Sequence, residues 1–359
     1  MEMDFLRRGY YAPPRLSCQA KSYLGGMGHV RLCGDAGNQA GSQCDGSHSV
    51  GGDEMKTIRR TDPKYALDSR HEVVARIGIG ESFLVETHDC RTGTITRPDQ
   101  VGDLLDTRRV NPATGPISVE GVTAGSTICI EVEEVRVDSR FGLMVTRPGV
   151  TSLEVTDEPQ LRIVTCDDGY ADVGSFRVPV IPMIGLLGVA PAGEPVSTFR
   201  GAEHGGNMDT LLIGSGSRVF LPAFFDGGLV YFGDVHASMG DGEVFLSGVE
   251  IAGRIQARIT LAPDWTLPTP LVENHDVVAV VAGGATFDEA AKAVLAKAVE
   301  VLAVAGMDRV DAGFLLSAAG HLRVCQYIPN ADLVHCRFEL PKSVLSLNRI
   351  KIPGLGAGS

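Results

Sequence analysis

The sequence predicts a mainly β protein, with a β-sandwich or β-barrel body over residues 55–265 and a smaller α/β lobe over residues 266–345. Two observations predict this arrangement. Between residues 70 and 265, many short runs are rich in β-branched and aromatic residues and are bounded by Gly, Pro or Asp. Beyond residue 286, one long stretch has apolar residues at helical spacing.

The predicted strands of the body follow one another closely along the chain. In order they are His71–Ile77, Ser82–Asp89, Thr127–Val137, Leu161–Val164, Arg177–Val180, Arg218–Phe225, Leu229–Gly233, Val244–Glu250 and Gly253–Leu261. The strong turn signal Asp226-Gly227-Gly228 joins two apolar runs and predicts that they form a hairpin.

The C-terminal lobe begins with one clear helix. Thr286-Phe287-Asp288-Glu289 is a capping box, with Thr at the N-cap and Glu three positions later. Apolar residues then recur at helical spacing up to Gly306, which we expect to close the helix. The strand-like runs expected after it are Phe314–Leu316, His321–Ile328 and Val334–Leu340.

Both ends of the chain differ from the rest. Residues 1–54 are rich in Gly, Ser, Gln and Asp without lasting periodicity, which predicts a flexible N-terminal extension. Cys33, Cys44 and His48 could form a metal knuckle there, but their spacing matches no familiar zinc pattern. Met55 opens the regular pattern, and residues 346–359 are expected to form a C-terminal tail.

Composition restricts the partners and the compartment. The chain has 359 residues, is 44% hydrophobic and 21% charged, and carries a net charge of -12. We expect no nucleic-acid partner, because no basic surface is concentrated in the sequence. No apolar run approaches the ~20 residues that cross a bilayer, so no membrane partner is expected. Eight cysteines without a CxxC pair, and no signal-peptide pattern, predict reduced thiols in the cytoplasm.

Polar side chains concentrate between residues 203 and 243. They lie in three glycine-rich phrases: Glu203-His204-Gly205-Gly206-Asn207-Met208-Asp209, Gly233-Asp234-Val235-His236 and Gly240-Asp241-Gly242-Glu243. Carboxylates and imidazoles together suit a divalent cation such as zinc. Glycines allow the backbone to take turn geometries that other residues avoid. We therefore predict a metal-assisted hydrolytic site at the rim of a β-sheet.

The metal-ligand candidates are His204, Asp209, Asp234 and His236. Asp234 and His236 are two apart at the end of an apolar strand, so both point the same way from a rigid element. Taken singly, each phrase has a structural alternative, because an Asp–His hydrogen bond can pin a turn and a Gly-rich loop can be a solvated turn. Their combination within one segment favours the metal site.

Three residues are candidates for the chemistry itself: Glu243, Asn207 and Asp89. Glu243 could act as general base toward a metal-bound water and then as acid toward a leaving amine. In favourable sites zinc lowers the pKa of such a water from 15.7 to about 7. Asn207 could polarise a carbonyl or hold an oxyanion. Asp89 is kept as an additional member of the site. We expect its neighbour Cys90 to pack in the core, since adjacent residues on a strand do not build a triad.

Several segments together resemble the acetamidase/formamidase family. They are Glu86–Cys90, Asn111–Gly121, Pro182–Pro191, His204–Asp209, Gly233–Ala237, Gly240–Glu243 and Leu322–Gln326. The likeness extends from Met55 to Val344. It implies a hydrolase that cleaves short linear amides to ammonia and a carboxylate by metal-activated water, a jelly-roll-like sandwich, a bound divalent metal with zinc as the expected ion, and a homo-oligomer. Residues 1–54 have no counterpart in it.

One departure from the family pattern keeps alternatives open. Met239 stands where the family usually has Gln, so the substrate could be a different amide, for example a cyclic amide or a carbamate. A further alternative is a non-catalytic β-sandwich module that uses a metal and carboxylates to hold a small polar ligand. Such a module would keep the same residues but would need no general base.

Overall fold

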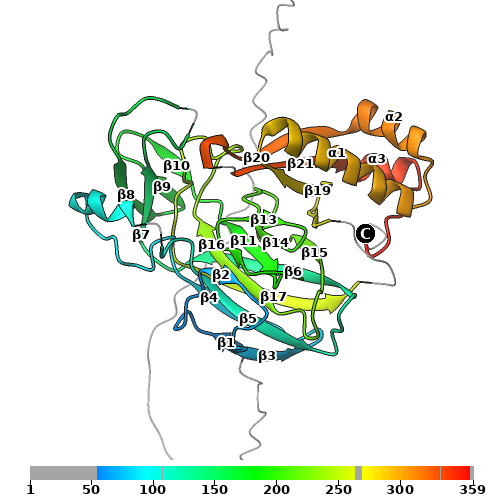
Figure 1. Ribbon diagram of the computed structural model, residues 1–359, viewed down its shortest axis with the longest axis horizontal. Coiled ribbons are helices and arrows are strands. Elements are labelled where there is room, and N and C mark those ends of the chain that lie inside the picture. The colour runs from blue at the N-terminus through cyan, green and yellow to red at the C-terminus, as the bar shows by residue number, and fades with distance from the viewer. Residues whose placement is uncertain (1–54, 107, 152, 263–268, 332, 356–359) are drawn as a thin grey trace, which may run out of the picture. The chain divides into compact units, whose positions relative to one another are not determined.

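The computed structural model describes residues 55–106, 108–151, 153–262, 269–331 and 333–355, which belong to one compact unit. Figure 1 shows the arrangement of its strands and helices. The expected N-terminal extension, with Cys33, Cys44 and His48, lies outside the described residues. None of the helices in the described ranges is long and apolar enough to cross a membrane.

The largest sheet has nine strands in the order β1-β4-β17-β6-β15-β18-β19-β21-β20. Their bounds are β1 Lys56–Ile58, β4 Ser82–Thr87, β17 Gly253–Leu261, β6 Thr127–Val137, β15 Arg218–Pro222, β18 Leu271–Glu273, β19 Val277–Gly284, β21 Leu333–Pro341 and β20 His321–Ile328. All neighbours in it are antiparallel except β1 and β4. Strands from the expected C-terminal lobe therefore extend the same sheet as the body.

Two further sheets have six and four strands. The six-stranded sheet runs β13-β14-β11-β16-β5-β3, and the four-stranded sheet runs β10-β9-β8-β7. Their bounds are β13 Gly201–Ala202, β14 Gly205–Asn207, β11 Met183–Val189, β16 Val230–His236, β5 Ala113–Glu120, β3 Ala75–Gly78, β10 Arg177–Pro179, β9 Tyr170–Asp172, β8 Gln160–Asp167 and β7 Phe141–Thr146. A two-stranded pair joins β12 (Val196–Ser197) to β2 (Ala66–Leu67).

The main hydrophobic core lies between the nine-stranded and six-stranded sheets. It contains Phe83 and Ile255 from the first and Leu187 and Phe232 from the second, all fully buried. Alternate residues of β17 are buried, as expected for a strand with one face in a core. Burial of each such side chain contributes roughly 1.5–3 kcal/mol. The body is thus a β-sandwich, and no sheet of the described residues closes into a barrel.

Helices α1 (Phe287–Val304), α2 (Arg309–Ala319) and α3 (Lys342–Leu347) lie together beside β19, β20 and β21 (Figure 1). The apolar face of α1, including Val294 and Leu302, packs in a second core with residues of β19 and β21. The two remaining helical segments are 3₁₀ turns, η1 (Pro98–Leu105) and η2 (Pro329–Ala331).

The predicted mainly β class is confirmed, and so are several elements. The strands Thr127–Val137, Gly253–Leu261 and His321–Ile328 have the predicted bounds. The capping box is also present: Thr286 Oγ1 accepts from the Glu289 N–H, and the Glu289 carboxylate accepts from the Thr286 N–H. Helix α1 ends before Gly306, whose φ of +88° suits glycine.

Three local predictions are wrong. Phe314–Leu316 lies within helix α2, because Asp308 caps a helix that the short apolar run concealed. Val244–Glu250 is a loop of turns, with residues such as Gly248 interrupting any ladder. The strands on either side of Asp226–Gly228 belong to different sheets, so this turn carries the chain across the sandwich and does not close a hairpin.

Candidate functional site

The glycine-rich phrases converge on one buried cluster of acids around His236. Asp209, Asp234 and His236 each offer a ligand atom, and these atoms lie within 4.8 Å of one another. His236, Glu243 and Glu250 form a second group, whose ligand atoms also lie within 4.8 Å of one another. All five side chains are at least nine-tenths buried. A metal-sized group of donors is thus assembled from segments that are separate in sequence; we call these five residues the acid cluster.

Three of these acids occupy an uncommon backbone conformation. The φ angles are +43° at Asp209, +55° at Asp234 and +44° at Glu243, and Asn111 beside them has +51°. Left-handed φ is rare for residues other than glycine and concentrates at functional sites, where the surrounding structure has to hold it. At Asp234 it occurs within strand β16.

Gly185 of β11 makes room for two of the carboxylates. A Cβ atom at this position would lie 2.4 Å from Asp209 Oδ1 and 2.8 Å from Asp234 Oδ2. It would also lie 2.9 Å from the Asp234 carbonyl oxygen, which cannot move without shifting β16. The Gly185 carbonyl in turn accepts from the Asp209 N–H at 3.2 Å. Only glycine therefore allows both acids to lie over this strand.

Three amide side chains orient the carboxylates. Asn207 Nδ2 donates to Asp209 Oδ2 at 2.8 Å, and Asn111 Nδ2 donates to Asp234 Oδ2 at 3.0 Å. Gln326 Nε2 bridges two acids, donating to Asp209 Oδ2 at 2.5 Å and to Glu243 Oε2 at 3.0 Å. These bonds fix one oxygen of each carboxylate and leave other oxygens facing the interior of the cluster.

Gln326 reaches the cluster because strand β20 is irregular there. The pairing of β20 with β21 shifts register between Val324 and Gln326, so Cys325 is an extra residue on β20. A bulge of this kind re-aims side chains and is common beside active sites. The Gly242 N–H donates to the Cys325 carbonyl, and the Tyr327 N–H donates to the Gly242 carbonyl. This parallel bridge also fixes the residue before Glu243.

Glu250 joins the cluster through the sheet edge. Its backbone exchanges hydrogen bonds of 2.9 Å with Leu143 of β7 and forms a bridge with His236 of β16. Its Oε1 lies 3.0 Å from His236 Nε2, closer than Asp234 Oδ1 at 3.7 Å or Glu243 Oε1 at 3.8 Å. Glu250 is therefore the nearest acid to the imidazole.

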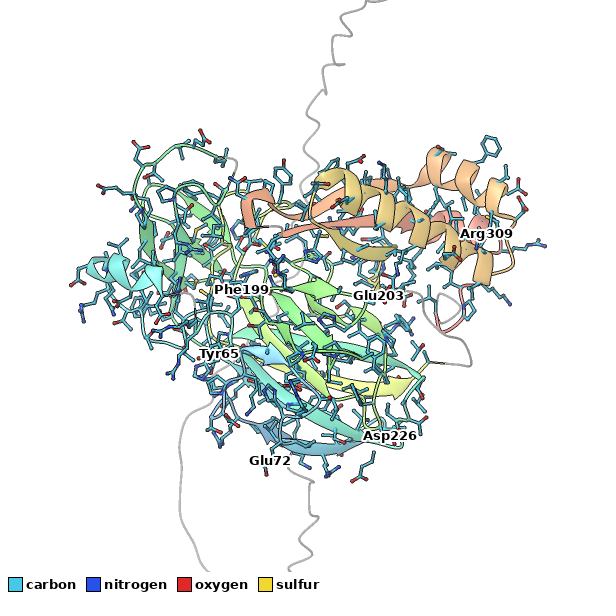
Figure 2. All side chains as sticks on the ribbon, viewed as in Figure 1. Tyr65, Glu72, Phe199, Glu203, Asp226 and Arg309 are labelled. Carbon is cyan, nitrogen blue, oxygen red and sulfur yellow. The ribbon has the colours of Figure 1, made fainter. Side chains whose placement is uncertain are left out.

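The cluster faces a small cavity of about 60 Å³. At ~10–15 Å³ for each water-sized group, this volume holds a ligand of a few non-hydrogen atoms. Apolar side chains form part of its wall, among them Val145, Leu246 and Phe199, the last labelled near the centre of Figure 2. Arg91 and Arg147 line it as well. The arrangement suits a small polar molecule held out of bulk water.

Burial and crowding raise the proton affinity of the cluster. Burial raises the pKa of Asp209 to about 6. Burial, together with the nearby Glu250, raises the pKa of Asp234 well above its usual value, and burial with Asp209 does the same for Glu243. Burial alone would lower the pKa of His236, but the charges of Glu250 and Asp234 outweigh it and raise that pKa. Such shifts are typical of groups that hold and release protons near neutral pH.

The same residues fit a divalent cation. Asp209 Oδ1, Asp234 Oδ1 and Glu250 Oε2 are buried and have no hydrogen-bond partner among the described residues. Leaving a buried charged oxygen without a donor or a cation is costly. Carboxylate oxygens with an imidazole nitrogen form a donor set that zinc accepts.

Two sequence-predicted site residues lie elsewhere. His204 is buried next to β14, but it belongs to neither group of ligand atoms; burial and the nearby His335 lower its pKa to about 4. Asp89 lies in a turn, where its Oδ1 accepts the N–H groups of Arg91 and Gly93 at 2.8 and 2.9 Å. The sequence around His204 and around Asp89 fits a local turn as well as a metal site, because Gly and Asp are common in turns and in metal sites.

Asp241, two residues before Glu243, also has a different partner. Its carboxylate receives two hydrogen bonds from Arg337, of 2.6 and 2.7 Å, whereas Glu243 turns into the cluster. Residues two apart share a face only on a strand, and the two carboxylates part here because this segment is a turn in which Gly242 has a φ of +94°.

Three site residues were missed by sequence reasoning: Glu250, Asn111 and Gln326. Asn111 and Gln326 lie in segments that carry the family resemblance, where a lone amide between apolar residues was the only signal. Glu250 stands between Val249 and Ile251, so an acid flanked by core residues could have indicated a buried role.

Comparisons with known proteins identify similar sequences and structures. Residues 67–199 and 192–345 match the model of the acetamidase/formamidase family. A formamidase of Methylophilus methylotrophus is 26% identical over 254 residues, an alignment that covers 54% of this chain and 62% of that protein. The chain thus spans less than two thirds of that relative.

Solved structures cover more of the chain. The crystal structure of an acetamidase from Bacillus halodurans has a TM-score of 0.77 and 32% identity, covering 82% of this chain and 100% of the other. A protein described as a predicted acetamidase/formamidase, from Thermoanaerobacter tengcongensis, has a TM-score of 0.78 and 31% identity. That match covers 83% of this chain and 99% of the other.

Proposed function

The chain belongs to the acetamidase/formamidase family, and from this premise we propose that it hydrolyses the carbon–nitrogen bond of short linear amides. The products are ammonia and a carboxylate. The observation that carries this proposal is the acid cluster at the small cavity, with its unpartnered buried oxygens and raised pKa values. This arrangement supports chemistry on a small molecule that needs both an electrophilic centre and a proton carrier.

A divalent metal, which we propose to be Zn²⁺, would be held by Asp209, Asp234 and His236, with Glu250 as a further candidate. When bound, such an ion polarises a carbonyl and makes water more acidic. His204 is left out of this set because its side chain lies outside the cluster.

Glu243 is the proposed proton carrier. Its carboxylate is fixed by the Gly248 N–H on Oε1, at 2.9 Å, and by Gln326 on Oε2. With a raised pKa it can take a proton from the attacking water and deliver it to the amide nitrogen. The water oxygen then bonds to the carbonyl carbon, the carbon–nitrogen bond breaks, and ammonia leaves.

The amide side chains act mainly by positioning. Asn207 and Asn111 hold Asp209 and Asp234 by the bonds described above, so the proposed role of Asn207 toward an oxyanion would add to a role in orientation. Gln326 Oε1 is buried without a partner among the described residues. It can accept a hydrogen bond from the NH₂ group of the substrate and thereby favour a primary amide.

Ammonia release tests the proposal directly. Purified protein is incubated with formamide, acetamide and propionamide, and ammonia is quantified for the wild type, for Glu243→Gln and for a matched surface control, Glu203→Gln. Glu203 is an exposed acid that pairs with Lys297 of α1. We expect turnover in the wild type and the control, and loss in Glu243→Gln. Absence of turnover on every linear amide would contradict the proposal.

A binding module remains distinguishable from an enzyme. It would bind a small amide in calorimetry, in both wild type and Glu243→Gln, without releasing ammonia. The single-residue effect at Glu243 therefore separates the two functions, since only the enzyme needs a proton carrier.

We further propose a cytoplasmic protein that assembles as a homo-oligomer, a dimer or larger. The reduced state is supported by five buried, unpaired cysteines among the described residues. Light scattering of the full chain tests the assembly, and a monomer would contradict it.

A further inference from the structure

Two arginines line the same cavity as the acid cluster, Arg91 and Arg147. They come from different parts of the chain. Arg91 lies in the turn after β4, and Arg147 directly follows β7. The cavity is therefore lined by acids, amides and two arginines, and the proposed amide chemistry uses only the acids and amides.

Arg91 is held in place without being neutralised. It is 7% exposed, and its guanidinium donates to the Asp106 carbonyl at 2.7 Å and to the Leu104 carbonyl at 3.2 Å. Both acceptors are uncharged backbone groups, and Arg91 Nε has no partner among the described residues. Since no acid in the described ranges pairs with it, its positive charge remains available to the cavity.

Arg147 has fewer partners than Arg91. It makes no hydrogen bond or ion pair with a described residue, and its Nε is buried without a partner. Pro148 follows it and restricts its backbone to extended conformations, which limits the directions its side chain can take. Burial, and after it the charge of Arg91, lower the pKa of Arg147.

Arg91 and Arg147 line one cavity, and neither forms an ion pair with an acid among the described residues, so their positive charge is not directly paired there. A partly buried, unpaired charge is destabilising unless a ligand supplies the opposite charge. Planar guanidinium groups bind carboxylates through paired, charge-assisted hydrogen bonds. The acids of the cluster do not serve as that partner, because none forms an ion pair with Arg91 or Arg147.

We propose that Arg91 and Arg147 bind a carboxylate carried by the substrate, so that the preferred substrates are small amides that also bear a carboxylate. This inference rests on the proposed amide hydrolysis. Its amide end would face the acid cluster, and its anionic end would face the arginines. The cavity of about 60 Å³ limits the spacer between them to very few atoms.

A matched series of substrates tests this. Oxamate, malonamate and succinamate differ by one methylene each, and each has a neutral partner of the same shape: isobutyramide, isovaleramide and 4-methylpentanamide. We expect at least one anionic amide to exceed its neutral partner in kcat/KM by tenfold or more, since bonds to charged groups are of that strength. Equal or better use of every neutral partner would overturn the inference.

Variants then assign the effect to the arginines. In Arg147→Gln the ratio of anionic to neutral kcat/KM should fall by about tenfold to a hundredfold, mainly through KM, and Arg147→Lys should recover part of it. Arg162→Gln, an exposed arginine of β8, is the matched control and should leave the ratio as in the wild type. A ratio that is the same in Arg147→Gln as in this control would overturn the inference.

Failure of the two proposals looks different. If neutral amides are hydrolysed well and the ratio does not depend on Arg147, the amidase stands and the anion subsite is wrong. If no amide is hydrolysed, the subsite is tested by calorimetry with malonate. Malonate binding that is at least tenfold weaker in Arg147→Gln than in the wild type would support the subsite. Equal binding by the two proteins, or no binding by the wild type, would overturn it.

Discussion

The carboxylates of the site depend on a few residues that set their direction. Asp209, Asp234 and Glu243 all leave the backbone at left-handed φ angles, which Asp tolerates better than most residues. Gly185 supplies the space that two of them occupy, and Gln326 ties two of them together. The site is therefore sensitive to single atoms at positions that carry no charge.

Replacement of Glu243 by Gln should remove proton transfer and keep the local fold. Gln retains an oxygen that can accept the Gly248 N–H, while its NH₂ group faces Gln326 Nε2, which donates to Glu243 Oε2 in the wild type and has to reorient. We expect kcat to fall by roughly 10²–10⁴-fold, the usual contribution of a general acid or base. Steady-state ammonia release measures this, with a thermal melt as the control for folding. Wild-type kcat in a folded variant would exclude Glu243 as the proton carrier.

Replacement of Gly185 by Ala should damage the site through sterics alone. Its methyl group would fall 2.4 Å from Asp209 Oδ1, so both the carboxylate and β11 have to shift. We expect a loss of stability of about 1–3 kcal/mol, together with a large loss of activity. Urea unfolding and ammonia release measure the two effects.

Gly240→Ala is the matched control for this change, because a Cβ at Gly240 meets no atom within 4 Å. An active, equally stable Gly185→Ala protein would show that the carboxylates do not need their present positions.

The residue scale also shows what the sequence can and cannot predict about the site. Asp209, Asp234, His236 and Glu243 were predicted to share a site because their phrases combine ligand chemistry with glycines, and their side chains do lie in one cluster. His204 has the same chemistry and lies in the turn before β14, but it belongs to neither group of ligand atoms, and no local pattern distinguishes these outcomes. Glu250 was missed because its role depends on a bridge between two strands.

At the scale of elements, strands with strong alternation were predictable and short apolar runs were not. Strand β17 alternates buried and more exposed residues from Gly253 to Thr260, so its pattern alone predicts it. Residues Phe314–Leu316 are too few to show a helical or a strand periodicity. The segment is helical, and Asp308 caps its N-terminus by accepting backbone N–H groups. Pairing of distant strands, such as β15 with β18, has no local signature.

Helix α1 offers a direct test of an element predicted from the sequence. Thr286→Ala removes the hydroxyl that accepts the Glu289 N–H, and with it one of the two hydrogen bonds of the capping box. We expect destabilisation of about 1 kcal/mol, measured by urea unfolding. Thr286→Ser keeps the hydroxyl and serves as the control. Equal stability of the Ala and Ser variants would contradict the capping role.

At the scale of the whole molecule, the site lies where three parts of the fold meet. Strand β16 brings Asp234 and His236 from the six-stranded sheet, and Gln326 arrives on β20 of the nine-stranded sheet. Glu250 connects to β7 of the four-stranded sheet. The sequence predicted the mainly β class because strand composition is local, but this junction depends on strand order, which local patterns do not encode.

The buried acids make the stability of the metal-free protein depend on pH. The pKa of Asp209 rises from 3.8 unfolded to about 6 folded, so the folded state binds more protons between these values. Its contribution is fully present below about pH 4 and is lost as pH rises through about 6. The raised pKa values of Asp234, Glu243 and His236 act in the same direction.

Thermal melts of chelator-treated protein should therefore show stability falling as pH rises from 4 toward neutrality. A shift of this size in Asp209 corresponds to about 3 kcal/mol. Asp209→Asn, which cannot ionise, should give a shallower slope. If the variant and the wild type lose stability in parallel over this range, Asp209 is not the group that titrates.

The central claim is that the acid cluster around His236 holds a divalent cation on which amide hydrolysis depends. The most direct measurement follows metal content and ammonia release in the same sample, before chelation, after chelation and after titration with Zn²⁺. We predict that activity falls with the bound metal and returns in proportion to the Zn²⁺ restored, with about one equivalent sufficing for one such site. Full amide hydrolysis by protein that contains no divalent cation would contradict the account.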